Sequence, residues 1–205
     1  MDIEPLEQLL KPKVQYIDCD VAGPAGDARR YRATIYHLAD APDDGDRARL
    51  RGMISGDPGF ERLFERYGAI TLYCDANSDA AGVFIARPSL WGKLKTEVAE
   101  WLDAIPVKVR AKIVPAWFDD AIVFAGAPYS PDHFAMPQSG KYRGKVFRFS
   151  HESLAFEPFA ETLSAFVQTI CTPSEDLMEF MADYLRFSDG VSDTQWCPLT
   201  YGCED

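Results

Sequence analysis

The chain has 205 residues and a net charge of −11, with 47% hydrophobic and 13% aromatic residues. The length suits a single domain, and this globular composition excludes a disordered or collagen-like chain. The longest apolar stretch, 121–127, is too short to cross a bilayer, and the acidic N-terminus lacks the apolar run of a signal peptide. We therefore expect no membrane-spanning segment and no membrane partner.

The first half of the chain predicts strands and one clear amphipathic helix. Residues 1–30 suggest a short amphipathic start followed by a loop around 23–26. A strand is expected at 31–37 and an acidic loop at 40–46. Asp57 and Pro58 predict the cap and first turn of a helix. Its apolar face would comprise Phe60, Leu63, Phe64 and Tyr67. Strands at 69–74 and 83–87 follow, joined by a turn at 75–82.

The second half predicts three helices and several short extended segments. Ser89 is expected to cap a helix with an apolar face of Leu90, Leu94, Val98, Trp101 and Leu102. Extended segments are expected near 112–117, 121–125, 133–136 and 145–149. Pro158 would open a helix with the stripe Phe159, Leu163, Phe166, Val167 and Ile170. Ser174 would start a last helix that buries Leu177, Met178, Phe180, Met181, Tyr184 and Leu185.

The order of these elements indicates the fold class. Helices do not alternate regularly with strands, which argues against a doubly wound parallel sheet. The pattern instead favours an α+β fold in which helices pack on an antiparallel sheet.

Two stretches resemble ligand-binding loops but lack a required residue. In the glycine-rich stretch 140–146 the glycines are one residue too close, and Val146 replaces the hydroxyl that would bind magnesium. In the acidic stretch that starts at Asp40, Pro42 and Arg51 stand where a calcium loop needs oxygen ligands. We therefore interpret 40–46 as a loop of solvated acids.

The cysteines and histidines predict neither a metal site nor a catalytic residue. The odd number of cysteines without repeating spacing favours free thiols in a reducing cytosol, and hence a cytoplasmic protein. They are Cys19, Cys74, Cys171, Cys197 and Cys203. Neither Cys197 nor Cys203 has a partner at zinc-ligand spacing, and no second histidine follows His151-Glu152 at the spacing of a zinc protease. We expect no cofactor.

A catalytic dyad with a serine or cysteine stays open for the three histidines, His37, His133 and His151. No spacing indicates one, however, and no Gly-x-Ser-x-Gly motif is present. Histidines more often satisfy a hydrogen bond in a turn or strand. We expect His151 to do so in the turn after the strand at 145–149.

The negative charge is concentrated at the C-terminal end. Residues 151–205 contain eleven acidic residues and one basic residue, Arg186, so they carry ten of the eleven excess negative charges. Such a field repels nucleic acid and anionic membranes and attracts a basic protein surface. The alternative is an acidic surface that serves solubility alone.

Three stretches share their order of elements with a known family. Residues 60–91 predict a helix ending in an aromatic residue and glycine, then two strands and a helix bearing Trp91. Residues 117–136 predict central strands. Residues 144–167 contain a glycine-opened strand, an aromatic-x-aromatic pair, a His-acid turn and a Phe-rich helix. These stretches, together with 184–205, resemble proteins of the SUKH superfamily. Residues 1–50 have no counterpart there, and 1–30 would be an N-terminal extension.

The resemblance implies a single α+β domain with a strongly twisted antiparallel sheet flanked by helices. Bacterial members of the superfamily are similar to immunity proteins that neutralise secreted toxins, many of them nucleases. Its yeast relatives resemble regulators of cell-wall glucan synthesis. We therefore expect a non-enzymatic protein-binding domain that neutralises a toxin with a basic surface. The alternatives are a regulatory or scaffolding protein and an unrecognised enzyme.

The candidate partner-binding residues lie near the C-terminus. Glu175, Glu179 and Asp183 are four residues apart and would form a stripe on one flank of the last helix. Asp189, Asp193, Gln195 and Trp196 follow in the next loop. Carboxylates around an aromatic anchor suit a basic partner. The alternative is that Trp196 is part of the core and the stripe only a solvated helix face.

Overall fold

The computed structural model describes residues 3–11, 13–21, 30–53 and 58–204. The predicted loop around 23–26 and the predicted cap at Asp57 lie outside these residues. In chain order, the elements are α1 (Glu4–Leu9), β1 (Val14–Val21), β2 (Arg30–Ala39), α2 (Asp44–Met53), α3 (Pro58–Arg66), β3 (Ile70–Asp75), β4 (Val83–Ile85), η1 (Pro88–Leu90), α4 (Trp91–Asp103), α5 (Val107–Ile113), η2 (Ala116–Asp120), β5 (Ile122–Gly126), β6 (His133–Met136), η3 (Gly140–Tyr142), β7 (Val146–Ser150), β8 (Ala155–Ala160), α6 (Leu163–Cys171), α7 (Glu175–Tyr184) and β9 (Trp196–Glu204).

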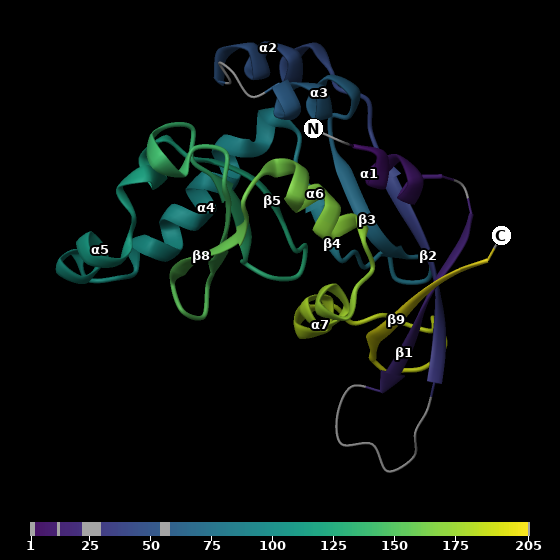
Figure 1. Ribbon diagram of the computed structural model, residues 1–205. Coiled ribbons are helices and arrows are strands. Elements are labelled where there is room, and N and C mark those ends of the chain that lie inside the picture. Colours follow the sequence, from purple (N-terminus) through teal and green to yellow (C-terminus); the bar gives the residue numbers. More distant parts are fainter. Residues whose placement is uncertain (1–2, 12, 22–29, 54–57, 205) are drawn as a thin grey trace.

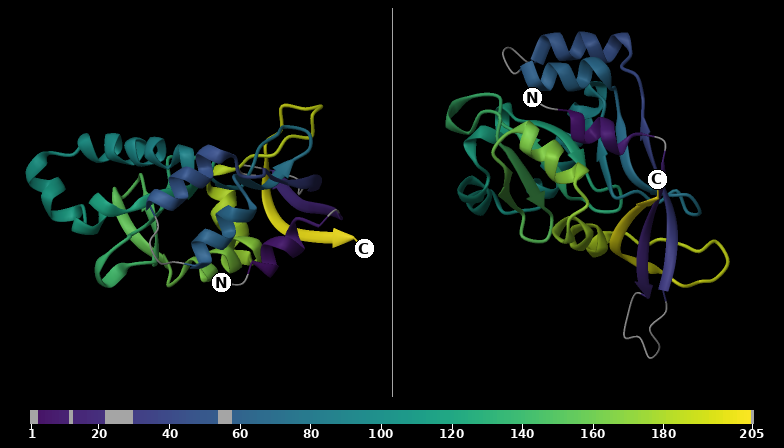
Figure 2. Two further views of the ribbon diagram at one scale, coloured as in Figure 1. Left: turned by 90° about the horizontal axis from the view of Figure 1, so that it is seen from above. Right: turned by 45° about the vertical axis from the view of Figure 1, so that its right-hand side comes forward.

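The described strands form one antiparallel sheet in the order β8-β7-β6-β5-β4-β3-β2-β1-β9. Figure 1 shows how far the sheet twists, with β1, β2 and β9 turned away from the strands around β5. In Figure 2, α2 and α3 lie together at one end of the molecule, and α4 and α5 project from a different side of it. The predicted α+β fold, a twisted antiparallel sheet flanked by helices, is confirmed.

Helices cover both faces of the central strands. Successive side chains of a strand point to opposite faces. In β6, His133 lies against Glu97 of α4, with 3.4 Å between Nε2 and the carboxylate, while Phe134 packs on Phe166 of α6, with ring centroids 5.0 Å apart. Helices α4 and α6 therefore lie on opposite faces. This explains why β5 is buried along its whole length and reads as a continuous apolar run.

The helix predicted from Pro158 starts later than expected. Pro158 and Phe159 lie in β8, the edge strand, and α6 begins at Leu163 after Thr162, whose hydroxyl accepts a hydrogen bond from Ala165 N. An edge strand tolerates proline because one side of it needs no backbone donor. Phe159 still reaches the core, where its ring lies 4.7 Å from that of Phe134. The residues of the predicted stripe thus pack on the core from two elements instead of one, with Phe159 partly buried.

Two further expectations between residues 89 and 117 are wrong. Ser89 lies in η1, and α4 begins at Trp91 without a side-chain cap. The segment 112–117 is extended only at Val114 and Pro115, because α5 ends just before them and η2 begins just after. A β-branched residue followed by proline indicates extended backbone, but that signal covers two residues here, and no strand pairs with them among the described residues.

The interpretation of 40–46 as a loop of solvated acids is also wrong. Asp44 begins α2, and Asp46 is completely buried. Asp43 and Asp46 each accept a hydrogen bond from the other's backbone N–H, at 2.8 and 3.3 Å. The guanidinium of Arg87 lies 2.9 Å from Asp43 and 3.7 Å from Asp46. These acidic residues therefore begin helix α2 and form ion pairs with Arg87 of the same chain.

The N-terminal residues belong to the main core. Strand β1 pairs with both β2 and β9, and Leu6 and Ile17 have no exposed surface. Strands β1, β8 and β9 were not among the predicted elements. No helix in the described parts of the chain combines the length and apolar character needed to cross a membrane.

Candidate functional site

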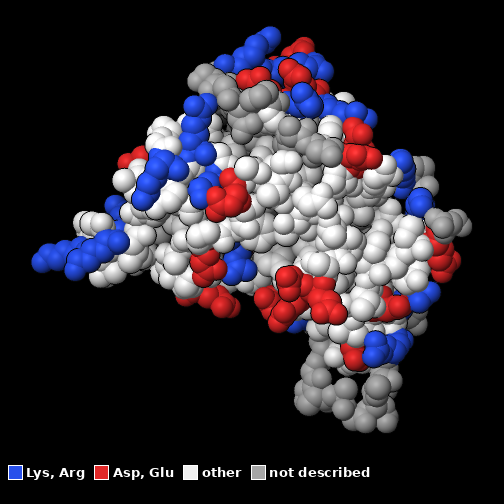
Figure 3. Space-filling model, in the orientation of Figure 1, with Lys and Arg blue, Asp and Glu red and all other residues white. Residues whose placement is uncertain are grey.

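The predicted acidic stripe forms on α7. Ser174 caps this helix as expected, because its hydroxyl accepts a hydrogen bond from Leu177 N at 3.2 Å. The carboxylates of Glu175, Glu179 and Asp183 are exposed, whereas Leu177, Met178 and Met181 on the opposite flank are buried. Figure 3 shows carboxylates gathered over α7. We call Glu175, Glu179 and Asp183 the acidic stripe.

The stripe is not neutralised from within the described chain. No described lysine or arginine lies within ion-pair distance of its three carboxylates. Arg186, the one basic residue after 150, instead donates hydrogen bonds to the carbonyls of Ala182 and Leu185 at 2.5 and 2.8 Å. It thereby satisfies acceptors at the C-terminal end of α7. The negative charge of the stripe therefore faces solvent.

The other predicted site residues divide into structural and exposed ones. Asp189 accepts hydrogen bonds from Val191 N and from both N and Oγ of Ser192. These bonds, led by that from Ser192 N, lower the pKa of Asp189 to about 2. Trp196 is only 6% exposed, and its Nε1 donates to Asp189 at 3.4 Å. Trp196 is therefore part of the core, and Asp189 orders its loop. Asp193 and Gln195 remain exposed.

The exposed aromatic residue beside the stripe is Trp101 of α4, which is 41% exposed. Its ring centroid lies 5.6 Å from that of His151, which lies 6.3 Å from that of Tyr184 at the end of α7. These contacts connect α4, the β7–β8 turn and α7 at one end of the sheet. Trp101 was predicted to belong to the apolar face of its helix, and that prediction is wrong. Leu94, Val98 and Leu102 are four residues apart and buried, whereas Trp101 lies at the edge of the stripe that they define.

Asp132 holds this end of the sheet together. Its side chain is 1% exposed, and Oδ1 accepts hydrogen bonds from the backbone N and from Nδ1 of His151 at 2.9 and 2.7 Å. Its Oδ2 accepts one from the Tyr184 hydroxyl at 3.3 Å. Burial, with Asp132 and Glu152 nearby, raises the pKa of Tyr184. His151 is therefore a hydrogen-bonding turn residue, as predicted, and the β5–β6 turn is tied to α7.

Replacing Asp132 by alanine should lower the free energy of unfolding by about 2 kcal/mol, because it leaves the His151 donors without their acceptor. Urea unfolding followed by circular dichroism measures this change. The exposed Asp193→Ala variant is the control and should lose less than about 0.5 kcal/mol. Equal losses in the two variants would contradict the role given to Asp132.

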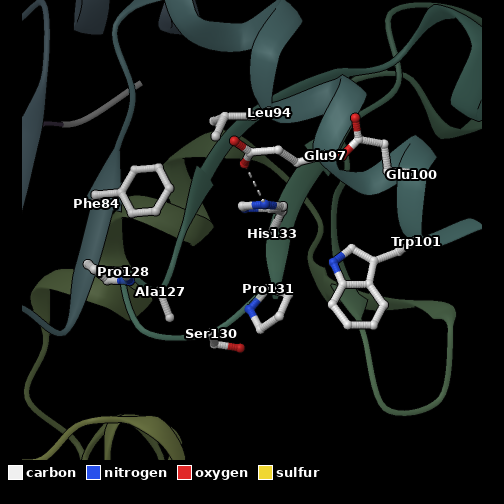
Figure 4. Close-up of a pocket in the computed structure, with 10 residues that line it drawn as sticks. All are labelled: Phe84, Leu94, Glu97, Glu100, Trp101, Ala127, Pro128, Ser130, Pro131 and His133. Carbon is white, nitrogen blue, oxygen red and sulfur yellow. Dashed lines mark ion pairs between the residues drawn. The ribbon is translucent and has the colours of Figure 1, made fainter.

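A pocket of about 280 Å³ lies between α4 and the β5–β6 turn. It is lined by Phe84, Leu94, Glu97, Glu100, Trp101, Ala127, Pro128, Ser130, Pro131 and His133 (Figure 4). Figure 4 shows Glu97, Glu100 and Trp101 projecting from α4, with Pro131 and His133 facing them. Because Asp132 lies between Pro131 and His133, the same hydrogen bonds that tie down the turn also hold one wall of the pocket.

His133 forms the floor of the pocket. Its side chain is 7% exposed, Nε2 lies 3.4 Å from Glu97, and Nδ1 has no hydrogen-bond partner among the described residues. A Cβ added to Gly126 would lie 2.7 Å from Nδ1, so glycine is needed for this close packing. Burial lowers the pKa of His133, against the opposing effect of Glu97 and Asp132. The imidazole is therefore neutral near pH 7 and adds no positive charge to the pocket.

None of the side-chain partners described for the three histidines is a nucleophile. His37 contacts Tyr73 N and Gln15, while His133 and His151 contact carboxylates. No serine, threonine or cysteine side chain pairs with them in the described residues. Within the same ranges, no group of three or more histidine, cysteine or acidic side chains could hold a metal ion.

No known family model matches this sequence, and no curated protein matches it significantly. The arrangement of the described side chains therefore carries the functional argument. It consists of an unneutralised acidic stripe, a pocket with two carboxylates, and the contacts that join them.

Proposed function

We propose that this chain is a non-enzymatic protein-binding domain that recognises a basic protein surface through the acidic stripe. The observation that carries the proposal is the exposure of Glu175, Glu179 and Asp183 without a neutralising cation in the described structure, while Arg186 is used inside the fold. A stripe kept for solubility alone does not require Arg186, the one basic residue in 151–205, to bind backbone carbonyls instead of a carboxylate.

The partner that we propose is a toxin domain, which this protein would bind and neutralise in the cytoplasm. The resemblance of this chain to the SUKH superfamily, whose bacterial members are similar to immunity proteins, supports this proposal. A nuclease toxin has a basic cleft for phosphate, which a row of carboxylates complements. Such complementarity accelerates association toward about 10⁸–10⁹ M⁻¹s⁻¹ at low salt and suppresses wrong partners.

Reversing two charges of the stripe should slow association with the partner. We expect the double variant Glu179→Lys/Asp183→Lys to lower the association rate constant about tenfold at low salt and to flatten its salt dependence. The partner is first identified by affinity capture and mass spectrometry, and association is then followed by stopped-flow fluorescence. Asp189 is left intact because it orders its own loop.

The matched control is Asp44→Lys/Glu65→Lys, which changes the net charge equally at exposed positions of α2 and α3. In Figure 1 these helices lie at the opposite end of the molecule from α7. The control should bind almost as fast as the wild type. If both variants slow association equally, only net charge matters and the stripe is not the interface. If the partner's toxic activity persists when this protein is bound, the neutralising role is wrong.

A further inference from the structure

The pocket beside α4 has the chemistry of a site for an organic cation. Two carboxylates, Glu97 and Glu100, lie on its α4 side, and none of the described residues that line it is a lysine or arginine. Among the described residues, the cation paired with these two carboxylates is Lys93, whose Nζ lies 3.7 Å from Glu97 but whose side chain is 73% exposed. An exposed ion pair of this kind contributes little and is easily exchanged. The pocket thus repels anions and attracts a positive group.

Its aromatic walls suit a flat cation. Trp101 is the largest exposed aromatic side chain at the rim, and the Phe84 ring packs against His133 at 6.4 Å between centroids. A guanidinium group stacks on an indole face and binds a carboxylate through two parallel N–H donors. An ammonium group is a compact, strongly hydrated charge that uses neither feature as well.

The carboxylate of Glu97 lies against His133 on the pocket floor. His133 is buried against Gly126 and lies 3.4 Å from this carboxylate through Nε2. The neutral imidazole can donate one hydrogen bond there without cancelling the negative charge. Figure 4 shows this pair at the centre of the pocket, with Glu100 and Trp101 one turn further along α4.

The pocket and the acidic stripe adjoin each other. Trp101 contacts His151, and His151 contacts Tyr184, the last residue of α7. The turn that carries His151 also carries the exposed Glu152. A basic surface lying along α7 would thus extend to the mouth of the pocket.

We propose that this pocket receives an arginine side chain of the basic partner. The inference rests on the proposed function and names one contact within it: a guanidinium group stacked on Trp101 and paired with Glu97 and Glu100. The stripe then governs how fast the partner arrives, and the pocket governs how long it stays.

The probe that tests this is N-acetyl-L-arginine methylamide, with the uncharged citrulline analogue as its matched control. The Trp101 indole N–H signal, assigned by its loss in Trp101→Phe, is followed by heteronuclear NMR. We expect the arginine probe to shift this signal saturably with a Kd of about 1–10 mM, and the citrulline analogue to bind at least about tenfold more weakly. The variant Glu97→Gln/Glu100→Gln should weaken arginine binding by about tenfold or more.

The stripe variant Glu179→Lys/Asp183→Lys separates this inference from the proposed function, because it should bind the arginine probe like the wild type. Unchanged thermal unfolding of Glu97→Gln/Glu100→Gln shows that the pocket variant is folded. Equal binding of the arginine and citrulline probes would overturn the arginine assignment. Equal binding of the arginine probe and the corresponding lysine derivative, N-acetyl-L-lysine methylamide, would also overturn it. So would the absence of a saturable shift up to about 50 mM. None of these results would alter the outcome expected from reversing the stripe.

Discussion

Replacing Phe166 by alanine should lower the free energy of unfolding by about 3–5 kcal/mol, the largest effect that we expect from a single substitution. Phe166 has no exposed surface, and its ring lies 5.2 Å from that of Phe124 and 5.0 Å from that of Phe134. These neighbours belong to β5 and β6, so truncation leaves a cavity between α6 and the sheet. The lost contacts and the unfilled volume add to each other because the close-packed sheet under α6 relaxes only in part.

Urea unfolding gives this free energy from the shift of the midpoint at constant slope. The matched control is Tyr129→Ala, which removes an aromatic ring that is 58% exposed and should cost less than about 1 kcal/mol. A loss below about 1 kcal/mol for Phe166→Ala would mean that α6 does not pack on β5 and β6 as described.

Acidification should destabilise the protein through His37. This side chain lies at an irregularity in β2, opposite Tyr73, whose backbone φ is 59°. Its Nδ1 accepts a hydrogen bond from Tyr73 N at 3.0 Å, and Nε2 therefore carries the proton that it donates to Gln15. A second proton on Nδ1 would face the Tyr73 N–H. The folded structure thus requires the neutral imidazole.

The pKa of His37 shows in which direction stability changes. Burial lowers it from 6.5 to about 4, so between these values the unfolded chain binds a proton that the folded chain does not. The contribution of neutral His37 is therefore complete above pH 6.5 and is lost as the pH falls toward 4. The shift corresponds to a loss of about 3 kcal/mol across this window.

The variant His37→Asn tests this assignment, because its amide oxygen can accept from Tyr73 N but does not titrate. We expect it to be less stable than the wild type near pH 7 and to lose about 3 kcal/mol less between about pH 7 and pH 4. His133, whose pKa is also lowered, is present in both proteins, so its effect cancels in the comparison. Parallel stability profiles would show that His37 does not cause the acid sensitivity.

Several features of the fold follow from local sequence alone. Helix α7 begins after Ser174 as predicted, because a cap and an amphipathic repeat act within one segment. Helix α3, with its apolar repeat, and the strands from β2 to β7, with their apolar pattern and flanking turns, also follow from local signals. The acidic stripe was also predictable, because residues four apart on a helix share a flank. The excess of acidic residues in the C-terminal quarter can be counted from the sequence.

Only the tertiary structure decides which segments pair at the edges of the sheet. Strand β9 contains Pro198 and Gly202, which disfavour a strand, yet it pairs with β1 from the other end of the chain. Strand β8 contains Pro158 and pairs with β7 alone. In both cases the partner supplies hydrogen bonds and burial that outweigh a weak local preference. No pattern within β8 or β9 predicts which strand it pairs with.

The functional surface divides in the same way. The sequence predicts the carboxylates of α7 correctly and leaves Trp196 as either an aromatic anchor or a core residue. Trp196 is buried, and the exposed aromatic residue near α7 is Trp101. Trp101, His151 and Tyr184 come from three elements far apart in the chain, and Asp132 joins two of those elements through one buried carboxylate. Periodicity shows which flank of a helix is apolar, but which neighbour covers that flank depends on how the sheet twists and where its turns meet. The pocket of Glu97 and His133 therefore exists only in the folded chain.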